Sequence, residues 1–226
     1  MKAMILAAGR GERMRPLTDT LPKPLLKVQG KALIVWHIEK LVKSGFKEII
    51  INIAHLGYKI PEYLGDGSKY GAKIYYSDEQ KSGALESAGG IKKALPLLGD
   101  TPFLVVNGDV FCDYEFDTSF DLKGKKAHLI LVPNPEHNKK GDFSLKDNLL
   151  LNEAPEMYTF SGIGYYDPAL FESVTLQKSA LAPLLRMHIE QSEVSGEVFK
   201  KLWHDIGTPE RLKEINNENK TTPYTT

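Results

Sequence analysis

Small and basic residues follow the first apolar run of the chain. The run at residues 4–6 (MIL) predicts a buried strand, because a strand covered on both faces need not alternate, and the small residues 7–9 (AAG) come directly after it. Glycine lets the backbone approach an anion closely and turn its N–H groups toward it. Arg13 and Lys23 add a planar fork for phosphate oxygens and a mobile point charge. This segment is therefore suited to binding a nucleoside triphosphate.

The glycine spacing excludes two common nucleotide-binding motifs. The dinucleotide fingerprint G-x-G-x-x-G needs a third glycine where this chain has Met14, and Pro16 follows two residues later. The P-loop pattern G-x-x-x-x-G-K-[ST] does not occur in the chain. Gly9 and Gly11 alone are as typical of a structural turn as of a phosphate site. The missing glycine also argues against a dehydrogenase.

Two aspartates stand where strands are expected to end. Asp109 follows the apolar run at residues 103–107, and Asp205 lies in the segment W-H-D-I-G-T. Ligands of open α/β sheets bind at the carboxyl ends of strands. Mg²⁺ prefers one or two carboxylates together with substrate phosphates and water, so the two aspartates would suffice if the fold brings them together. Each one alone is at least as typical of a turn or a helix cap.

The elements that must position these residues alternate between strand and helix in the first half. Strands are expected at residues 47–52, 72–77 and 103–107, and helices at 33–42, 56–64 and 91–98. Strands separated by helices imply right-handed crossovers and a mainly parallel sheet with helices on both faces. We predict a Rossmann-like, three-layer α/β fold in a single domain.

From residue 125 onward the pattern changes to strands with fewer helices between them. Strands are expected at 127–132, 142–145, 149–151, 158–166 and 196–203, and helices at 181–191 and 212–216, the last opening near Pro209. These elements predict a mixed extension of the sheet. We expect one domain over residues 1–216, with a polar, flexible tail at 217–226.

The composition limits the partners. The 226 residues carry 29 basic and 29 acidic side chains, so no net charge favours nucleic acid or a membrane surface. Cys112 is the single cysteine, which excludes an intrachain disulfide and is typical of a reducing cytoplasm. No run approaches the ~20 apolar residues of a membrane span, and the apolar stretch before Gly9 is too short for a signal peptide. We expect a cytoplasmic protein with small-molecule partners and no nucleic-acid or membrane partner.

The longer motifs resemble those of the sugar-1-phosphate nucleotidyltransferases. The resemblance rests on four motifs: G-x-G-x-R-M-x-P-L-T at residues 9–18, P-K-P-L at 22–25, N-G-D at 107–109 and W-x-D-I-G-T at 203–208. At position 12 this chain has Glu, where the family frequently has Thr. The resemblance covers nearly the whole chain. It implies nucleotidyl transfer from a nucleoside triphosphate to a sugar 1-phosphate, with Mg²⁺ and release of pyrophosphate. It also implies a nucleotide-binding part at residues 1–124 and a sugar-phosphate part at 125–207.

The resemblance carries over to individual residues. The segment L-E-S-A-G-G-I at 85–91 is similar to L-E-T-G-G-G-I of one branch of the family. Ala88 replaces a glycine there, and alanine would be strained if this position required a positive φ. The expected catalytic residues are Arg13 and Lys23, and the expected metal ligands are Asp109 and Asp205. Nucleotide binding is expected at Ala8, Gly9, Gly11, Glu12, Arg13, Lys23, Glu86, Ser87 and Asn107, and sugar-phosphate binding at Asn107, Asp142, Glu153, Ser161 and Gly162.

Within the family, the segments G-D-F at 141–143, T-F-S-G-I at 159–163 and L-A-P-L-L-R at 181–186 resemble a uridylyltransferase branch of cell-wall recycling. That likeness implies UTP and N-acetylmuramic acid 1-phosphate as substrates. We expect a monomer or weak homodimer. The lactyl carboxylate of this sugar needs a cation or a helix N-terminus, and Lys139, Lys140 and Arg186 are candidate cations, although the two lysines are as a type more typical of an exposed surface. Thymidylyl, guanylyl or cytidylyl transfer to another phosphate stays open. A non-catalytic sugar-nucleotide sensor is disfavoured because Arg13, Lys23 and both aspartates are present.

Overall fold

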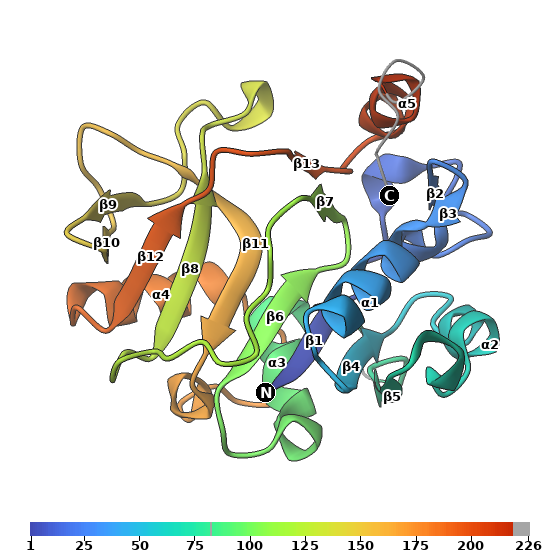
Figure 1. The fold of residues 1–226 in the computed structure, drawn as a ribbon, viewed down its shortest axis with the longest axis horizontal. Coiled ribbons are helices and arrows are strands. Elements are labelled where there is room, and N and C mark those ends of the chain that lie inside the picture. The colour runs from blue at the N-terminus through green and yellow to red at the C-terminus, as the bar shows by residue number, and fades with distance from the viewer. Residues whose placement is uncertain (82, 219–226) are drawn as a thin grey trace.

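A mixed nine-stranded sheet forms the centre of the computed structural model, which describes residues 1–81 and 83–218 (Figure 1). Its strands lie in the order β5-β4-β1-β6-β11-β8-β12-β10-β9. Their bounds in chain order are β1 (Lys2–Leu6), β4 (Glu48–Ile53), β5 (Lys73–Asp78), β6 (Phe103–Asn107), β8 (Ala127–Val132), β9 (Ser144–Lys146), β10 (Leu149–Leu151), β11 (Thr159–Tyr166) and β12 (Val194–Val198).

Helices and short ladders complete the described part of the chain. The α-helices are α1 (Leu33–Lys43), α2 (Lys59–Leu64), α3 (Glu86–Leu98), α4 (Leu181–Glu190) and α5 (Pro209–Glu218). Single 3-10 turns are η1 (Glu12–Met14), η2 (Lys23–Leu25), η3 (Ser68–Tyr70), η4 (Glu136–Asn138) and η5 (Pro168–Phe171). Two small ladders pair β2 (Lys27–Val28) with β3 (Lys31–Ala32), and β7 (Val110–Cys112) with β13 (Trp203–Asp205).

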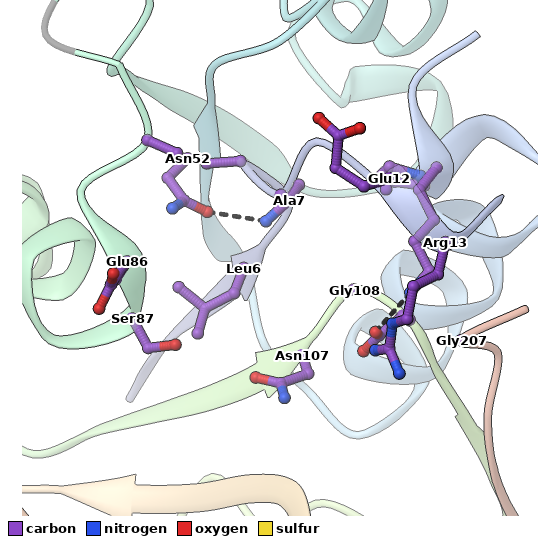
Figure 2. A pocket seen from close by; sticks show the side chains of 17 residues that line it. Leu6, Ala7, Glu12, Arg13, Asn52, Glu86, Ser87, Asn107, Gly108 and Gly207 are labelled. Carbon is purple, nitrogen blue, oxygen red and sulfur yellow. Dashed lines mark hydrogen bonds and ion pairs between the residues drawn. The ribbon is translucent and has the colours of Figure 1, made fainter. Parts of the chain in front are cut away.

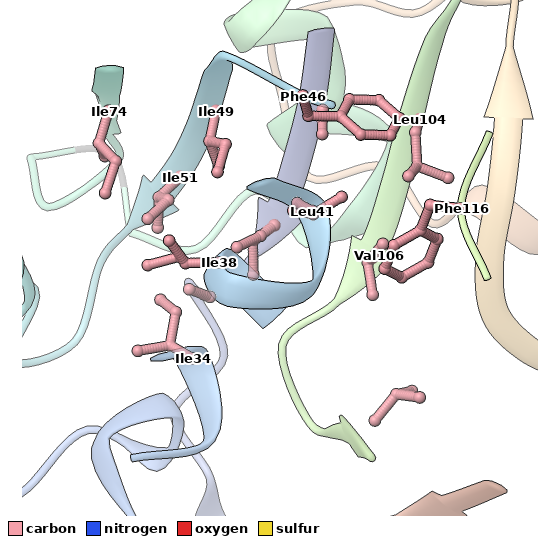
Figure 3. Close-up of a cluster of buried hydrophobic side chains, with 14 of the residues drawn as sticks. Ile34, Ile38, Leu41, Phe46, Ile49, Ile51, Ile74, Leu104, Val106 and Phe116 are labelled. Carbon is pink, nitrogen blue, oxygen red and sulfur yellow. The ribbon is translucent and has the colours of Figure 1, made fainter. Parts of the chain in front are cut away.

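The sheet is covered by helices on both faces. Along β1, the side chains of Ala3 and Ile5 belong to the core formed with α1 and α2, whereas Met4 belongs to the core formed with α3 and α4. Successive side chains of a strand point to opposite faces, so a fully apolar strand serves both layers. Figure 3 shows the first core, where Ile38 and Leu41 of α1 face the sheet. These two cores confirm the predicted Rossmann-like, three-layer α/β fold.

The parallel strands bring their carboxyl ends to one edge. Strands β5, β4, β1 and β6 are mutually parallel, and β11 then pairs antiparallel with β6 and β8. In this register Leu6 lies between Asn52 of β4 and Asn107 of β6. The loops that follow these three residues therefore begin side by side.

The structure corrects three predicted elements. The strand expected over 196–203 is split, because β12 pairs with β8 only up to Val198 and β13 pairs instead with β7. No glycine or proline lies between Val198 and Trp203, so the sequence does not mark the change of partner. Helix α3 begins at Glu86, five residues before the expected start at Ile91. Helix α5 extends into the predicted tail as far as Glu218, and residues 219–226 lie outside the described residues.

A small third core attaches the last helix to the loops at the carboxyl edge of the sheet. Ile215 of α5 and Ile206 pack with Phe111 of β7, Met14 and Val28. Within residues 1–81 and 83–218, no helix is long and apolar enough to cross a bilayer.

His37 of α1 gives the fold a dependence on pH. Its side chain is 5% exposed, and burial together with the charge of Lys40 lowers its pKa from 6.5 to about 4, against weaker raising effects of Asp109 and the Val110 backbone. The unfolded chain therefore binds more protons at this residue than the folded chain between these values. The contribution of His37 to stability is fully present above its ordinary pKa and is lost as the pH falls toward 4.

We expect His37→Gln to flatten the pH dependence of the free energy of unfolding between pH ~6.5 and ~4, by up to roughly 1.4 kcal/mol per pH unit. Urea unfolding of the wild type and the variant over this range measures the difference. Parallel curves for the two proteins would contradict the assignment.

Candidate active site

A cavity of about 400 Å³ opens at the carboxyl edge of β1, β4 and β6. Figure 2 shows Asn52, Glu86 and Ser87 toward one end and Arg13 near Gly207 toward the other. The loop after β1, η2, the start of α3 and the turn between β6 and β7 contribute its walls. The lining residues are Leu6, Ala7, Ala8, Gly9, Gly11, Glu12, Arg13, Lys23, Pro24, Asn52, Ala84, Glu86, Ser87, Asn107, Gly108, Asp109 and Gly207.

All the residues expected to bind the nucleotide line this one cavity. They come from three stretches of the chain, around Gly9, Glu86 and Asn107, and the row of strand ends gathers them. The turn after β1 needs glycine at position 11, where φ is +66° and a Cβ would lie 2.9 Å from Cγ2 of Thr18. The Thr18 hydroxyl donates a hydrogen bond of 2.8 Å to the Gly11 carbonyl, which holds the turn closed.

The basic end of the cavity contains an ion pair. The ammonium group of Lys23 lies 2.6 Å from Oδ2 of Asp109, and the lysine side chain is 12% exposed. Arg13 lines the same end. A lysine and an arginine beside a carboxylate can bind phosphate oxygens and a cation at adjoining positions.

The β7–β13 ladder places Asp205 next to Asp109. Asp205 pairs in register with Val110, and the backbone N–H of Ile206 donates a 2.8 Å hydrogen bond to the Asp109 carbonyl. The Asp205 carboxylate contacts Arg211 of α5 and, at 3.0 Å, Nε2 of His137 in η4. The fold thus brings together two aspartates that lie 96 residues apart in the sequence (109 to 205).

The two aspartates fit a Mg²⁺ ion by their chemistry. Asp109 lines the cavity with the basic residues, and the ladder holds Asp205 next to Asp109, outside the lining itself. One or two protein carboxylates are what Mg²⁺ uses when substrate phosphates complete its coordination. Within the described parts of the chain, no group of three or more His, Cys, Asp or Glu side chains is gathered as a candidate metal site.

The start of α3 forms the opposite wall. Glu86 takes a positive φ of 62°, and Ala88 is a helical residue that does not need one. The substitution of Ala for Gly at position 88 is therefore compatible with the backbone. At Gly89, by contrast, a Cβ would lie 2.4 Å from the carbonyl oxygen of Gln177, so this position requires glycine.

Two residues expected on the sugar side line a second cavity of about 620 Å³. Asp142 and Glu153 lie there with Lys140 and Arg186. The Arg186 guanidinium donates to the Asp142 carbonyl at 3.1 Å and to the Asn152 carbonyl at 3.4 Å, so it joins the two loops that flank the β9–β10 hairpin.

The lysine beside Lys140 lies in a different environment. Lys139 pairs with Glu136 at 3.0 Å, and its side chain is 74% exposed. It is thus a surface residue, whereas Lys140 and Arg186 remain candidates for binding an acidic sugar.

Ser161 and Gly162 line neither cavity. Gly162 has a φ of +81°, and a Cβ there would lie 2.6 Å from Nδ2 of Asn107. Ser161 is 1% exposed, and its hydroxyl oxygen accepts a hydrogen bond from the Ile163 backbone. Both residues lie at the register shift between β11 and β8. In this geometry they support Asn107 and the sheet, and a sugar-phosphate contact of Ser161 would need its side chain to turn outward.

Sequence reasoning missed several residues of the site. Asn52 lines the first cavity, and Arg211 and His137 contact Asp205. The position of Asn52 at the carboxyl end of a predicted strand was an available signal. No sequence signal identifies His137, because its contact depends on how the loop after β8 meets β13.

The fold and the site define an α/β protein with a basic, glycine-containing cavity at the carboxyl edge of its sheet. The chain belongs to the Nucleotidyl transferase family, which it matches over residues 2–222, and it is a nucleotidyltransferase.

Relatives agree with this membership. An N-acetylmuramate alpha-1-phosphate uridylyltransferase of Neisseria meningitidis serogroup B is 54% identical over 225 residues, covering 95% of this chain and 96% of that protein. A UTP–glucose-1-phosphate uridylyltransferase of Synechocystis is 39% identical over 142 residues, 58% of this chain and 36% of that protein. A Bacillus anthracis structure, assigned as a glucose-1-phosphate thymidylyltransferase with bound sucrose, shares the fold with a TM-score of 0.85 at 20% identity, covering 100% and 98% of the two chains.

We expect Lys23→Ala and Arg13→Ala each to lower turnover by roughly a hundredfold or more, because each removes a preorganised cation from the phosphate end. Initial-rate measurement of pyrophosphate release, with circular dichroism to verify folding, tests both. Arg15→Ala is the matched control: Arg15 lies in the same loop but pairs with Asp19 at 3.0 Å, its side chain 62% exposed. Near-normal kinetics for Lys23→Ala or Arg13→Ala would remove that residue from the reaction.

Proposed function

We propose that this protein transfers UMP from UTP to N-acetylmuramic acid α-1-phosphate, giving UDP-N-acetylmuramic acid and pyrophosphate. The observation that carries the chemistry is the basic end of the cavity, where Lys23 pairs with Asp109 and the β7–β13 ladder adds Asp205. The substrates follow from the relative that is 54% identical over nearly the full length of both chains.

The reaction needs positioning and charge stabilisation more than proton transfer. The oxygen of a sugar 1-phosphate is already anionic near neutral pH, so no general base is required to make the nucleophile. The obstacles are the repulsion between two anions and the charge that grows on the leaving pyrophosphate. Arg13 and Lys23 would hold the phosphate oxygens in line for attack on the α-phosphorus and neutralise that charge.

Asp109 and Asp205 would hold the Mg²⁺ ion that the family resemblance implies. A bound Mg²⁺ ion supplies Lewis-acid stabilisation to the α-phosphate oxygens. Lys23 contacts Asp109 directly, and Arg211 contacts Asp205, so each carboxylate is oriented by a cation of the chain.

Different parts of the chain would bind the two substrates. Residues 1–124 would bind the nucleotide, and residues 125–207 would bind the sugar phosphate, with Asn107 between them. The second cavity supports the sugar side, since Asp142 and Glu153 can accept hydrogen bonds from sugar hydroxyl groups. We further propose a cytoplasmic protein of peptidoglycan recycling that acts as a monomer or weak homodimer, without nucleic-acid or membrane partners.

Glucose 1-phosphate is the second candidate acceptor. The Synechocystis relative, whose name specifies glucose 1-phosphate, is 39% identical over the part of the chain that it matches. Lys140 and Arg186 in the second cavity favour the acidic sugar, because a lactyl carboxylate would find a cation there and glucose offers no such group.

Pyrophosphate release tests the proposal. Purified protein with Mg²⁺ is assayed with UTP, dTTP, GTP and CTP against the 1-phosphates of N-acetylmuramic acid, N-acetylglucosamine, glucose and mannose, and against phosphocholine. We expect strong turnover only with UTP and N-acetylmuramic acid 1-phosphate, and none with the Asp109→Asn variant. Turnover with another pair would overturn the substrates and keep the reaction class. Nucleotide binding without turnover on any pair would favour a sensor.

A further inference from the structure

A buried carboxylate that the reaction does not use lies behind the nucleotide cavity. Glu79 directly follows β5 and is fully buried, and it is outside the cavity lining. Burying a charged group is costly unless hydrogen bonds compensate. The partners of Glu79 are therefore informative about its role.

Glu79 and Asn52 join three segments of the chain by short hydrogen bonds. Nδ2 of Asn52 donates to Oε1 of Glu79 at 2.8 Å, and the backbone N–H of Leu85 donates to Oε2 at 2.8 Å. Oδ1 of Asn52 accepts from the backbone N–H of Ala7, also at 2.8 Å (Figure 2). Ala7 begins the glycine-containing loop, and Leu85 directly precedes α3, so the pair links the two walls of one end of the cavity.

The donor pattern requires a carboxylate at position 79. The backbone N–H of Ala7 can only donate, so the amide oxygen of Asn52 must face it and its NH₂ group must face Glu79. Leu85 N–H is also only a donor. Two donors thus reach two different oxygens of one side chain. Glutamine offers a single acceptor oxygen, so its NH₂ group would oppose one of the two donors.

Helix α3 leaves room for this pair by having glycine at position 90. A Cβ there would lie 2.8 Å from Oε1 of Glu79 and 2.9 Å from Nδ2 of Asn52. Gly90 is a buried residue within the helix, where alanine is intrinsically the better helix former. Glycine at this position is explained by the space that the buried pair occupies.

We propose that Glu79 and Asn52 are positioning residues that set the nucleoside end of the cavity, and that they do so by fixing Ala7 and Leu85 to each other. This inference rests on the proposed nucleotide substrate. The phosphate end, with Arg13 and Lys23, is held by other contacts, namely the Gly11–Thr18 turn and the Lys23–Asp109 pair. The two ends of the cavity therefore respond to different substitutions.

Isothermal titration calorimetry with UMP and with inorganic tripolyphosphate separates the two ends. We expect Glu79→Gln to weaken UMP binding by about tenfold, since a buried donor loses its acceptor, and to leave tripolyphosphate binding unchanged. Lys23→Ala should weaken tripolyphosphate more than UMP. An equal loss of both ligands in Glu79→Gln, or unchanged UMP binding, would overturn the proposal, because a general loss of structure does not select one ligand.

One further variant separates positioning from direct contact with the ligand. Gly90→Ala disturbs the pair while the Glu79 carboxylate and Asn52, which lines the cavity, both remain, so it should weaken UMP binding as Glu79→Gln does. Normal UMP binding by Gly90→Ala would show that the positioning role is wrong.

A matched control lies at the opposite end of the same sheet region. Glu48 begins β4 and accepts a hydrogen bond from the Tyr75 hydroxyl at 3.0 Å, far along the strand from Asn52. Glu48→Gln should bind both ligands like the wild type. Failure of the wild type to bind UMP and UTP would refute the proposed function itself, whereas wild-type binding with a normal Glu79→Gln variant refutes only this inference.

Discussion

The parallel register of β4, β1 and β6 is the constraint on which the site depends. Asn52, Leu6 and Asn107 lie in one row, so three loops leave the sheet side by side. Backbone hydrogen bonds hold this row, and apolar side chains cover it on both faces. The edge can therefore present polar groups at defined positions, which is why ligands of open α/β sheets bind there.

Charge is distributed unequally along the cavity built on this row. At one end Lys23 orients Asp109, and Arg211 orients Asp205, so cations and carboxylates alternate where phosphates and a metal would meet. At the other end the buried Glu79 carboxylate accepts hydrogen bonds from two neutral groups, the Asn52 amide and the Leu85 backbone N–H. A phosphate chain is charged and a nucleoside is neutral, so this distribution of charge supports the orientation that we propose, with the phosphates at the end of Lys23 and the nucleoside at the end of Asn52.

The sequence predicted the three-layer fold because the pattern of apolar residues along the chain marks the strands and helices that the fold buries. Most expected strands appear within a residue or two, and β6 has the predicted bounds. The failures have physical causes. The segment predicted as one strand over 196–203 changes partner from β8 to β7, and no turn residue between Val198 and Trp203 marks this change. Helix α3 begins at Glu86, whose φ is positive, and the glycines at positions 89 and 90 led to a predicted start at Ile91.

By itself the sequence indicated which residues are expected to carry the phosphate chemistry, since the basic loop and the two aspartates are local motifs beside predicted strand ends. Only the tertiary structure decided what these residues contact. Asp109 meets Asp205 through the β7–β13 ladder, and Asn52 meets Glu79 across neighbouring strands. Ser161, expected at the sugar, is a buried residue of β11 that lines neither cavity. The physical reason is that hydrogen-bond partners far apart in the chain are selected by strand order and register, which local patterns do not contain.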